Sequence, residues 1–163
     1  MARDGETPRF VACNNVVFNA ALVTGQDLRF DPLFNLSGGE DFDFFEASRR
    51  LGNGHVWTGA AQVNEHVPAG RATLGALFYR HFTGAVTRVM QHRKWHGRWS
   101  AWPRFLLKAA GKGLGGVLEL LCLPLPDDRP RLRNAVKKFG NGAGYLCGLC
   151  GIRHRRYGRD GSP

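Results

Sequence analysis

Apolar residues recur at helical spacing most clearly between residues 71 and 90. The apolar residues are spaced three or four positions apart, which places them on one side of a helix and predicts a single long helix with one apolar stripe. Arg80 falls on a different face of the predicted helix, together with Gly84, Thr87 and Gln91. The stripe itself contains Leu74, Leu77, Phe78, Phe82, Ala85, Val86 and Val89.

Two further apolar segments follow this helix. Residues 105–125 are mostly apolar, but they include Lys108, Lys112 and Glu119 and are followed closely by prolines. Such a segment is a poor transmembrane helix and suits a helix that lies in the membrane interface or re-enters it. Residues 132–139 then predict a basic amphipathic helix, and residues 140–152 form a small, glycine-rich apolar segment.

The first 70 residues favour short extended segments instead. Clusters of β-branched and aromatic residues predict strands at 10–18, 54–58 and 61–67. Asn14 and Asn15 interrupt the first of these, where a turn or bulge is one explanation and a binding role the other. Residues 1–9 form a polar leader that we expect to be disordered.

A short helix or turn is predicted at 20–28, broken at Gly25. A longer helix is predicted to begin near Glu40 and to end at Gly52, a residue suited to a left-handed C-cap. Four acidic residues occupy its first turns, where the helix macrodipole favours negative charge. Its largely apolar face would consist of Phe44, Ala47, Ser48 and Leu51.

Two glycines, Gly38 and Gly39, directly precede the acids Glu40 and Asp41. Ser37 and Glu40 have the spacing of a capping box, which would make Glu40 a structural residue. A functional explanation is that the glycines leave the backbone uncovered, so that a bulky polar ligand can lie close to the two carboxylates.

The formal net charge is +10 and the pI about 10.2, which points to an anionic partner. Residues 26–46 are acidic, whereas the chain after residue 71 is strongly basic. Residues 91–104 interleave basic side chains with tryptophans, a pattern that suits nucleic-acid bases or a lipid headgroup layer. The apolar segment that follows favours the membrane, so nucleic acid is not the expected partner.

Neither the N-terminus nor the cysteines indicate secretion. No apolar signal segment follows Met1, so we expect the chain to stay in the cytosol. Cys13, Cys122, Cys147 and Cys150 are too few and too scattered for a disulfide scaffold. Cys147 and Cys150 lack a second pair that would complete a zinc site, so we interpret them as small apolar or lipid-attached residues.

The segments 30–34, 38–45 and 50–52 together resemble the acceptor-side motif of family 2 glycosyltransferases, and the similarity runs from about Asn14 to Arg88. It is greatest to bacterial enzymes that build exopolysaccharide at the inner membrane. The resemblance implies an α/β fold, in which a GT-A-like mixed sheet is represented by its C-terminal part and is followed by amphipathic or interfacial helices. It implies an acceptor-side part at 10–90 and a basic, membrane-associating tail at 91–159, and residues 160–163 are expected to be disordered.

The same resemblance assigns roles to the acids and their neighbours. Asp41 would be the catalytic base, and Glu40 would orient the site or cap its helix. Substrate-binding positions would be Asn14, Asn15, Gly38 and Gly39, with Arg71 and Arg80 as candidates for binding a diphosphate. A solvated basic face is the alternative explanation for the two arginines.

A divalent cation, Mg²⁺ or Mn²⁺, is the implied cofactor. His66 or Glu65 would be its ligand in this chain, and only one of them can face the site, since alternate residues of a strand point to opposite sides. An ordinary polar role is the alternative for both. Most of the cation's ligands would belong to a nucleotide-binding half with its own Asp-x-Asp motif. This sequence shows no such half, and its one Asp-x-Asp, at residues 41–43, lies inside the acceptor motif.

The implied activity is inverting transfer of a sugar from a nucleotide-sugar donor to a membrane-bound glycan or lipid-linked acceptor in exopolysaccharide synthesis. The expected location is the cytoplasmic face of the bacterial inner membrane, with peripheral attachment. Because the nucleotide-binding half is missing, we expect this chain to be truncated and inactive alone. The rival hypothesis is a non-enzymatic basic module that binds membrane or nucleic acid through residues 88–159.

Overall fold

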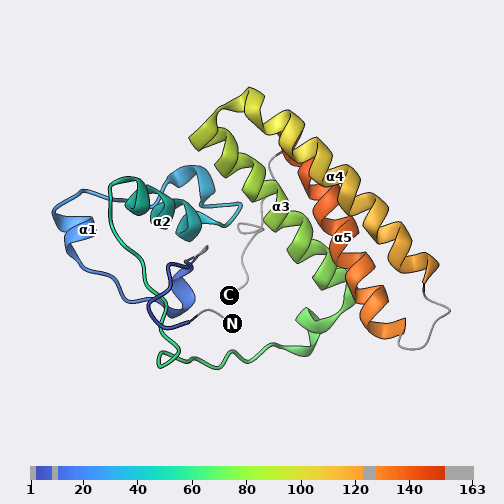
Figure 1. Cartoon of the computed structure of the whole chain (residues 1–163), viewed down its shortest axis with the longest axis horizontal. Helices are drawn as coiled ribbons and strands as arrows, with labels where there is room; N and C mark the ends of the chain where they lie inside the picture. Colours follow the sequence, from blue (N-terminus) through green and yellow to red (C-terminus); the bar gives the residue numbers. More distant parts are fainter. Residues whose placement is uncertain (1–2, 9–10, 123–127, 153–163) are drawn as a thin grey trace. The chain divides into compact units, whose positions relative to one another are not determined.

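The computed structural model describes residues 3–8, 11–122 and 128–152. All regular secondary structure within these ranges is helical (Figure 1). The chain forms two compact units, Met1–His66 and Val67–Pro163, here named the N-terminal and the C-terminal unit. The expected boundary at residue 90 falls inside a helix. The basic stretch 153–159 and the tail 160–163 lie outside the described residues, so the expectations for them stay predictions.

The expected α/β fold with a mixed sheet is wrong, because the described residues contain no strand. Ala12 and Val16 do have extended backbones (φ −133°, ψ 148° and φ −149°, ψ 142°), as their neighbours' β propensity indicated. Yet Val17 is fully exposed, and pairing near Trp57 is limited to two backbone hydrogen bonds, with Gly5 and Glu6. A strand needs a neighbour along most of its length, and these segments have none.

In its described residues the N-terminal unit contains four helices: η1 (Cys13–Asn15), α1 (Ala21–Thr24), η2 (Pro32–Phe34) and α2 (Glu40–Arg50). Its core consists of Leu22, Leu28, Phe44 and Phe45. The face that α2 buries contains Phe44 and Ser48 as expected, but it also includes Phe45 and Asp43, whereas Leu51 is exposed. Aromatic packing explains the difference: the rings of Phe44 and Phe45 lie 5.2 Å apart, and both contact Phe18.

Helix α2 begins and ends on glycines in the left-handed region. Gly38 (φ 77°) and Gly39 (φ 91°) precede its first residue, and Gly52 (φ 87°) follows its last turn. At the C-terminus, Gly52 N–H donates to Arg49 and Asn53 N–H donates to Ser48, which is a Schellman motif and confirms the predicted C-cap. The glycines are needed here because other residues are strained at these φ values.

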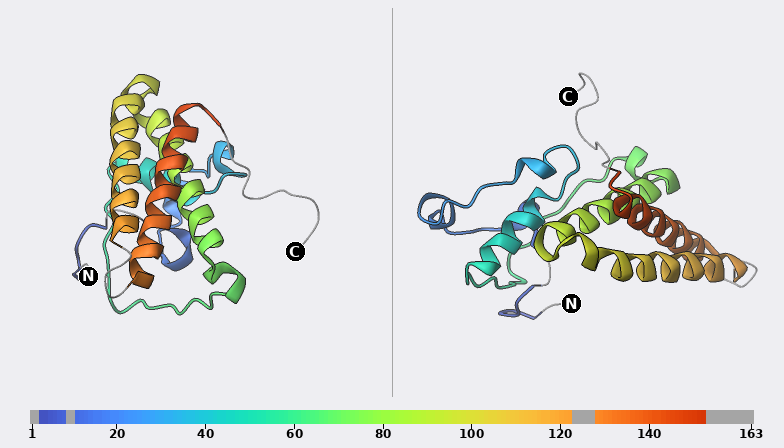
Figure 2. Two further views of the ribbon diagram at one scale, coloured as in Figure 1. Left: turned by 90° about the vertical axis from the view of Figure 1, so that its right-hand side faces the viewer. Right: turned by 90° about the horizontal axis from the view of Figure 1, so that it is seen from above.

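The C-terminal unit is a bundle of three long helices, α3 (Leu74–His96), α4 (Arg98–Leu121) and α5 (Asp128–Leu149), preceded by η3 (Ala69–Ala72). The helix predicted from the stripe at 71–90 is confirmed, and Thr73 caps it by accepting a hydrogen bond from Ala76 N–H. Gly97 (φ 86°) separates α3 from α4. Helix α5 packs against both other helices, running parallel to α3 and antiparallel to α4 (Figure 2).

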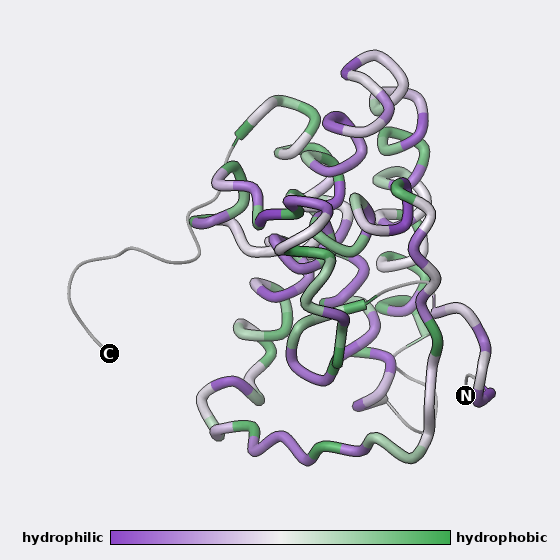
Figure 3. The backbone as a smooth tube through the Cα atoms, turned by 90° about the vertical axis from the view of Figure 1, so that its left-hand side faces the viewer, coloured by the Kyte–Doolittle hydropathy of each residue, from purple (hydrophilic) through white to green (hydrophobic). Residues whose placement is uncertain are grey.

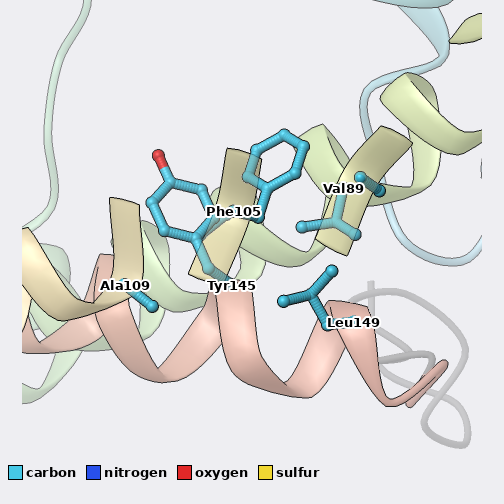
Figure 4. Packing of buried hydrophobic residues seen from close by; sticks show 7 residues of the cluster. Val89, Phe105, Ala109, Tyr145 and Leu149 are labelled. Carbon is cyan, nitrogen blue, oxygen red and sulfur yellow. The ribbon is translucent and has the colours of Figure 1, made fainter. Parts of the chain in front are cut away.

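The bundle core lies between all three helices. Phe105 of α4 and Tyr145 of α5 pack with ring centroids 5.2 Å apart (Figure 4). Around them lie Ala85 and Val89 of α3, Ala101 and Ala109 of α4, and Leu149 of α5. Hydrophobic and hydrophilic residues alternate along the helices (Figure 3). In the described ranges no helix is long and apolar enough to cross a membrane.

The glycine-rich segment at 140–152 is mostly helical, since α5 continues to Leu149. Gly140, Gly144 and Gly148 lie four residues apart, on one face of α5, against the backbone of α3. A Cβ at position 140 would lie 2.7 Å from the Phe78 carbonyl oxygen, and one at position 148 would lie 2.8 Å from Val89 Cβ. Glycine weakens a helix, but here its lack of a side chain lets two backbones approach closely.

Candidate acidic site at the start of α2

The two candidate carboxylates, Glu40 and Asp41, occupy the first turn of α2. Asp41 Oδ1 accepts a hydrogen bond from Phe42 N–H at 2.8 Å, and its Oδ2 accepts a long one from Cys13 N–H at 3.4 Å. The second bond joins α2 to η1, which lies 28 residues earlier in the chain. The start of a helix favours negative charge, so both acids lie where the backbone stabilises them.

Cys13 is a part of this site that the sequence analysis missed. Burial raises the pKa of its thiol, and the negative charges of Asp41 and Glu40 raise that pKa further. The thiol therefore stays protonated near neutral pH and adds no third negative charge. A lone cysteine matches no sequence motif. Only the position of Cys13, directly before the candidates Asn14 and Asn15, could have indicated that it belongs to this site.

Glu40 has an enclosed oxygen. Its Oε2 atom is shielded from solvent and has no hydrogen-bond partner among the described residues. The capping box that would have explained Glu40 is not formed, since Ser37 Oγ donates to the carbonyl oxygens of Phe34 and Gly38 instead. Buried polar atoms normally have a partner, so this oxygen is an unsatisfied acceptor at the start of α2.

The structure places both candidate asparagines on η1, directly after the residue that contacts Asp41. Asn15 Nδ2 donates to the Ala61 carbonyl oxygen at 2.9 Å, which holds η1 against the segment after Trp57. Asn14 is exposed. Gly38 and Gly39 lie immediately before the acids, and their left-handed φ values give them a conformational role beside any contact with a ligand.

The remaining candidates belong to other segments of the chain than η1 and the start of α2. Glu65 and His66 are exposed in a segment without secondary structure, at the end of the N-terminal unit. Arg71 on η3 and Arg80 on α3 are exposed residues of the C-terminal unit. In the part of the chain that the structure describes, no group of three or more His, Cys, Asp or Glu side chains could hold a metal ion.

Comparison with known proteins gives one relative. The chain is 33% identical over 157 residues to the succinoglycan biosynthesis protein ExoM of Rhizobium meliloti (strain 1021). The match covers 94% of this chain and 49% of ExoM, so the chain spans about half the length of that relative. No family model and no solved structure matches. The similarity supports the expected link to exopolysaccharide biosynthesis and leaves the type of reaction open.

Proposed function

We propose that this chain acts in exopolysaccharide synthesis as the acceptor-side part of an inverting family 2 glycosyltransferase. Its similarity to a succinoglycan biosynthesis protein along almost the whole chain supports the biosynthetic role. The observation that supports the reaction type is the presence of two adjacent carboxylates, Glu40 and Asp41, in the first turn of α2, with Glu40 Oε2 lacking a hydrogen-bond partner.

In the proposed reaction a hydroxyl of the acceptor attacks the anomeric carbon of a nucleotide sugar. The new bond joins that carbon to the acceptor oxygen, and the bond to the leaving diphosphate breaks with its electron pair on the diphosphate. Asp41 takes the proton of the attacking hydroxyl as general base. The long, weak bond from Cys13 N–H to Oδ2 leaves this carboxylate free to accept the proton.

Glu40 would bind the acceptor instead of taking a proton. A hydrogen bond from a second hydroxyl of the acceptor sugar to the Glu40 carboxylate would fix the orientation of the attacking group. Oε2 lacks a partner but is shielded from solvent, so the acceptor must open the site to reach it. The protonated Cys13 thiol limits the negative charge near the leaving diphosphate. Asn14 and Asn15 follow it on η1, within the same unit, and are the proposed contacts to the donor sugar.

The donor's nucleotide and any Mg²⁺ or Mn²⁺ ion would be held mostly by residues outside this chain. When bound, such an ion would balance the charge of the leaving diphosphate. Glu65 and His66 form no group of three or more possible metal ligands with other described residues, and the proposed reaction uses no ion bound by them. The proposed acceptor is a glycan or lipid-linked sugar at the cytoplasmic face of the inner membrane.

The test uses ExoM as the host. Residues 1–163 replace the half of ExoM that they match, and succinoglycan production is measured in a Rhizobium meliloti strain that lacks ExoM. Asp41→Asn keeps the shape and the acceptor for Cys13 N–H but removes the base, so the transfer rate should fall by about 10²- to 10⁴-fold. Glu40→Gln should have a smaller effect.

The matched control is Asp27→Asn, the same substitution at an exposed acid that pairs with Arg29. It should leave production unchanged. A graft carrying Asp41→Asn that accumulates normally and still makes succinoglycan at the rate of the unsubstituted graft would contradict the role of Asp41.

A second candidate, a non-enzymatic basic module, is favoured by one observation. Residues 67–152 carry fourteen Lys and Arg against three acidic residues. This module would need neither Asp41 nor Glu40, so it predicts that both substitutions leave the graft fully active.

A further inference from the structure

The outward side of α4 carries an uninterrupted apolar surface, here named the α4 outer face. Its most exposed members are Trp99, Leu107 and Leu121, with 80%, 76% and 71% of their surface accessible. The spacing of three or four residues places the whole set along one side of the helix. The α4 outer face consists of Trp99, Pro103, Leu106, Leu107, Ala110, Leu114, Val117, Leu118 and Leu121.

The opposite side of α4 is occupied within the bundle. Ala101, Phe105, Ala109 and Gly116 are buried there, against α5 and the core. Helix α4 lies at an edge of the three-helix bundle, so its other side has no neighbouring helix of the C-terminal unit (Figure 2). Leucines of the outer face are therefore in contact with water in the isolated chain, which is unfavourable by the hydrophobic effect.

The charges on α4 indicate what covers this face. Arg104, Lys108 and Lys112 recur at every fourth position off the apolar face. Their row turns from one flank towards the side that packs on α5, where Lys108 Nζ lies 5.1 Å from the centre of the Phe105 ring and Lys112 Cβ lies near Gly142. The one acid of the helix, Glu119, is already paired, since Lys138 Nζ of α5 lies 2.7 Å from its Oε1. At the start of the helix, Arg98 lies 5.9 Å from the centre of the Trp99 ring. Apolar surface, interfacial tryptophan and a cationic flank together match an anionic lipid surface.

We infer that the α4 outer face is a membrane-docking surface, with α4 lying in the plane of an anionic lipid bilayer and its leucines entering the acyl boundary. With 24 residues and its cations along the flank, α4 can lie along the interface, and it is not apolar enough to span. The inference deepens the proposed function, on which it rests for the identity of the membrane.

Two other occupants fit less well. In a symmetric pair of chains packed through this face, the row from Arg104 to Lys112 on each copy would add like charge at the edge of the contact. A nucleic acid would pair with the cations but would place phosphates and water against the leucines. A lipid interface satisfies both the charged flank and the apolar face.

The experiment uses the full chain and vesicles of phosphatidylcholine, prepared with and without phosphatidylglycerol. Cosedimentation should show binding that requires phosphatidylglycerol and weakens with salt. Substituting Leu107→Gln and Leu114→Gln together should lower the partition coefficient by about 10²-fold, because two leucine side chains no longer enter the apolar layer. Both positions are exposed, at 76% and 64%, so helix content by circular dichroism should not change.

The matched control substitutes Val56→Gln and Leu51→Gln, two residues of the N-terminal unit exposed by 76% and 57%. This variant should bind vesicles as the unsubstituted chain does. A third variant, Lys108→Gln with Lys112→Gln, should bind about tenfold more weakly and lose part of the salt dependence.

Equal vesicle binding by the Leu107/Leu114 variant and the unsubstituted chain would overturn the inference, as would a chain that does not bind these vesicles. Self-association that disappears with Leu107→Gln and Leu114→Gln would also overturn it and assign the face to a second copy. None of these measurements requires sugar transfer. If the vesicle assay fails but the ExoM graft makes succinoglycan as expected, only the docking surface is refuted. If the chain binds vesicles but the graft carrying Asp41→Asn is still active, only the catalytic role of Asp41 is refuted.

Discussion

The contact between α3 and α5 should not tolerate a side chain at position 144. In Gly144→Ala the new Cβ would lie 2.7 Å from Ala85 Cβ and closest of all to the Phe82 carbonyl oxygen. Neither neighbour is the flexible end of a side chain. The clash can therefore be relieved only by moving the two helices apart.

The magnitude follows from two opposing effects. Replacing glycine by alanine inside a helix stabilises it by up to about 1 kcal/mol. Separating two packed surfaces by roughly 0.5–1 Å forfeits a quarter to a half of their dispersion attraction, and overpacking commonly costs about 1–3 kcal/mol or more. Gly140 and Gly148 lie equally close to α3 on the same face of α5, so the contact between the two helices would open along its length. We expect a net loss of roughly 2–3 kcal/mol.

The assay is thermal unfolding of the full chain, followed by the fluorescence of the three tryptophans of the C-terminal unit in a Trp57→Phe background. For a unit of this size the loss corresponds to a fall in Tm of roughly 10–20 °C. Gly111→Ala on α4 is the control, because a Cβ there would meet nothing within 4 Å. Its Tm should be unchanged or higher. Equal Tm values for the two variants would refute the close backbone contact between α3 and α5.

Two further predictions concern pKa values. Asp41→Asn removes a negative charge beside Cys13 and should lower the pKa of the Cys13 thiol, so Cys13 should react faster with iodoacetamide at mildly alkaline pH. Mass spectrometry can measure this rate against that of exposed Cys150, the internal control. An unchanged rate for Cys13 would contradict the proximity of Cys13 and Asp41. Burial lowers the pKa of His81, and the charges of Lys137, Arg88 and Arg80 lower it further. When the pKa of a histidine is lower in the folded state than in the unfolded state, protons bind preferentially to the unfolded state, and the fold loses stability as pH falls through and below 6.5. The Tm should therefore fall on acidification. This fall should be smaller in His81→Gln than in the control variant His66→Gln.

Local signals in the sequence were sufficient where one short segment determines the structure. Helix α2 begins at the acids after Gly39 and ends in a Schellman motif at Gly52, because its caps and macrodipole depend on adjacent residues. The stripe between residues 71 and 90 predicted α3 for the same reason. The pair Glu40 and Asp41 was found from its motif, and the structure places both residues in the first turn of α2.

Contacts between distant segments decided the rest. The sequence by itself determined extended backbone beside η1, but a sheet also needs neighbouring segments, and the folded chain does not supply them in its described part. Residues 140–152 were described from the sequence only as a glycine-rich apolar segment. Helix propensity counts the entropic cost of glycine at 140, 144 and 148 and omits the close approach to α3 that glycine permits. Cys13 entered the acidic site for a similar reason: its hydrogen bond to Asp41 spans 28 residues, and only the tertiary fold brings η1 to the start of α2.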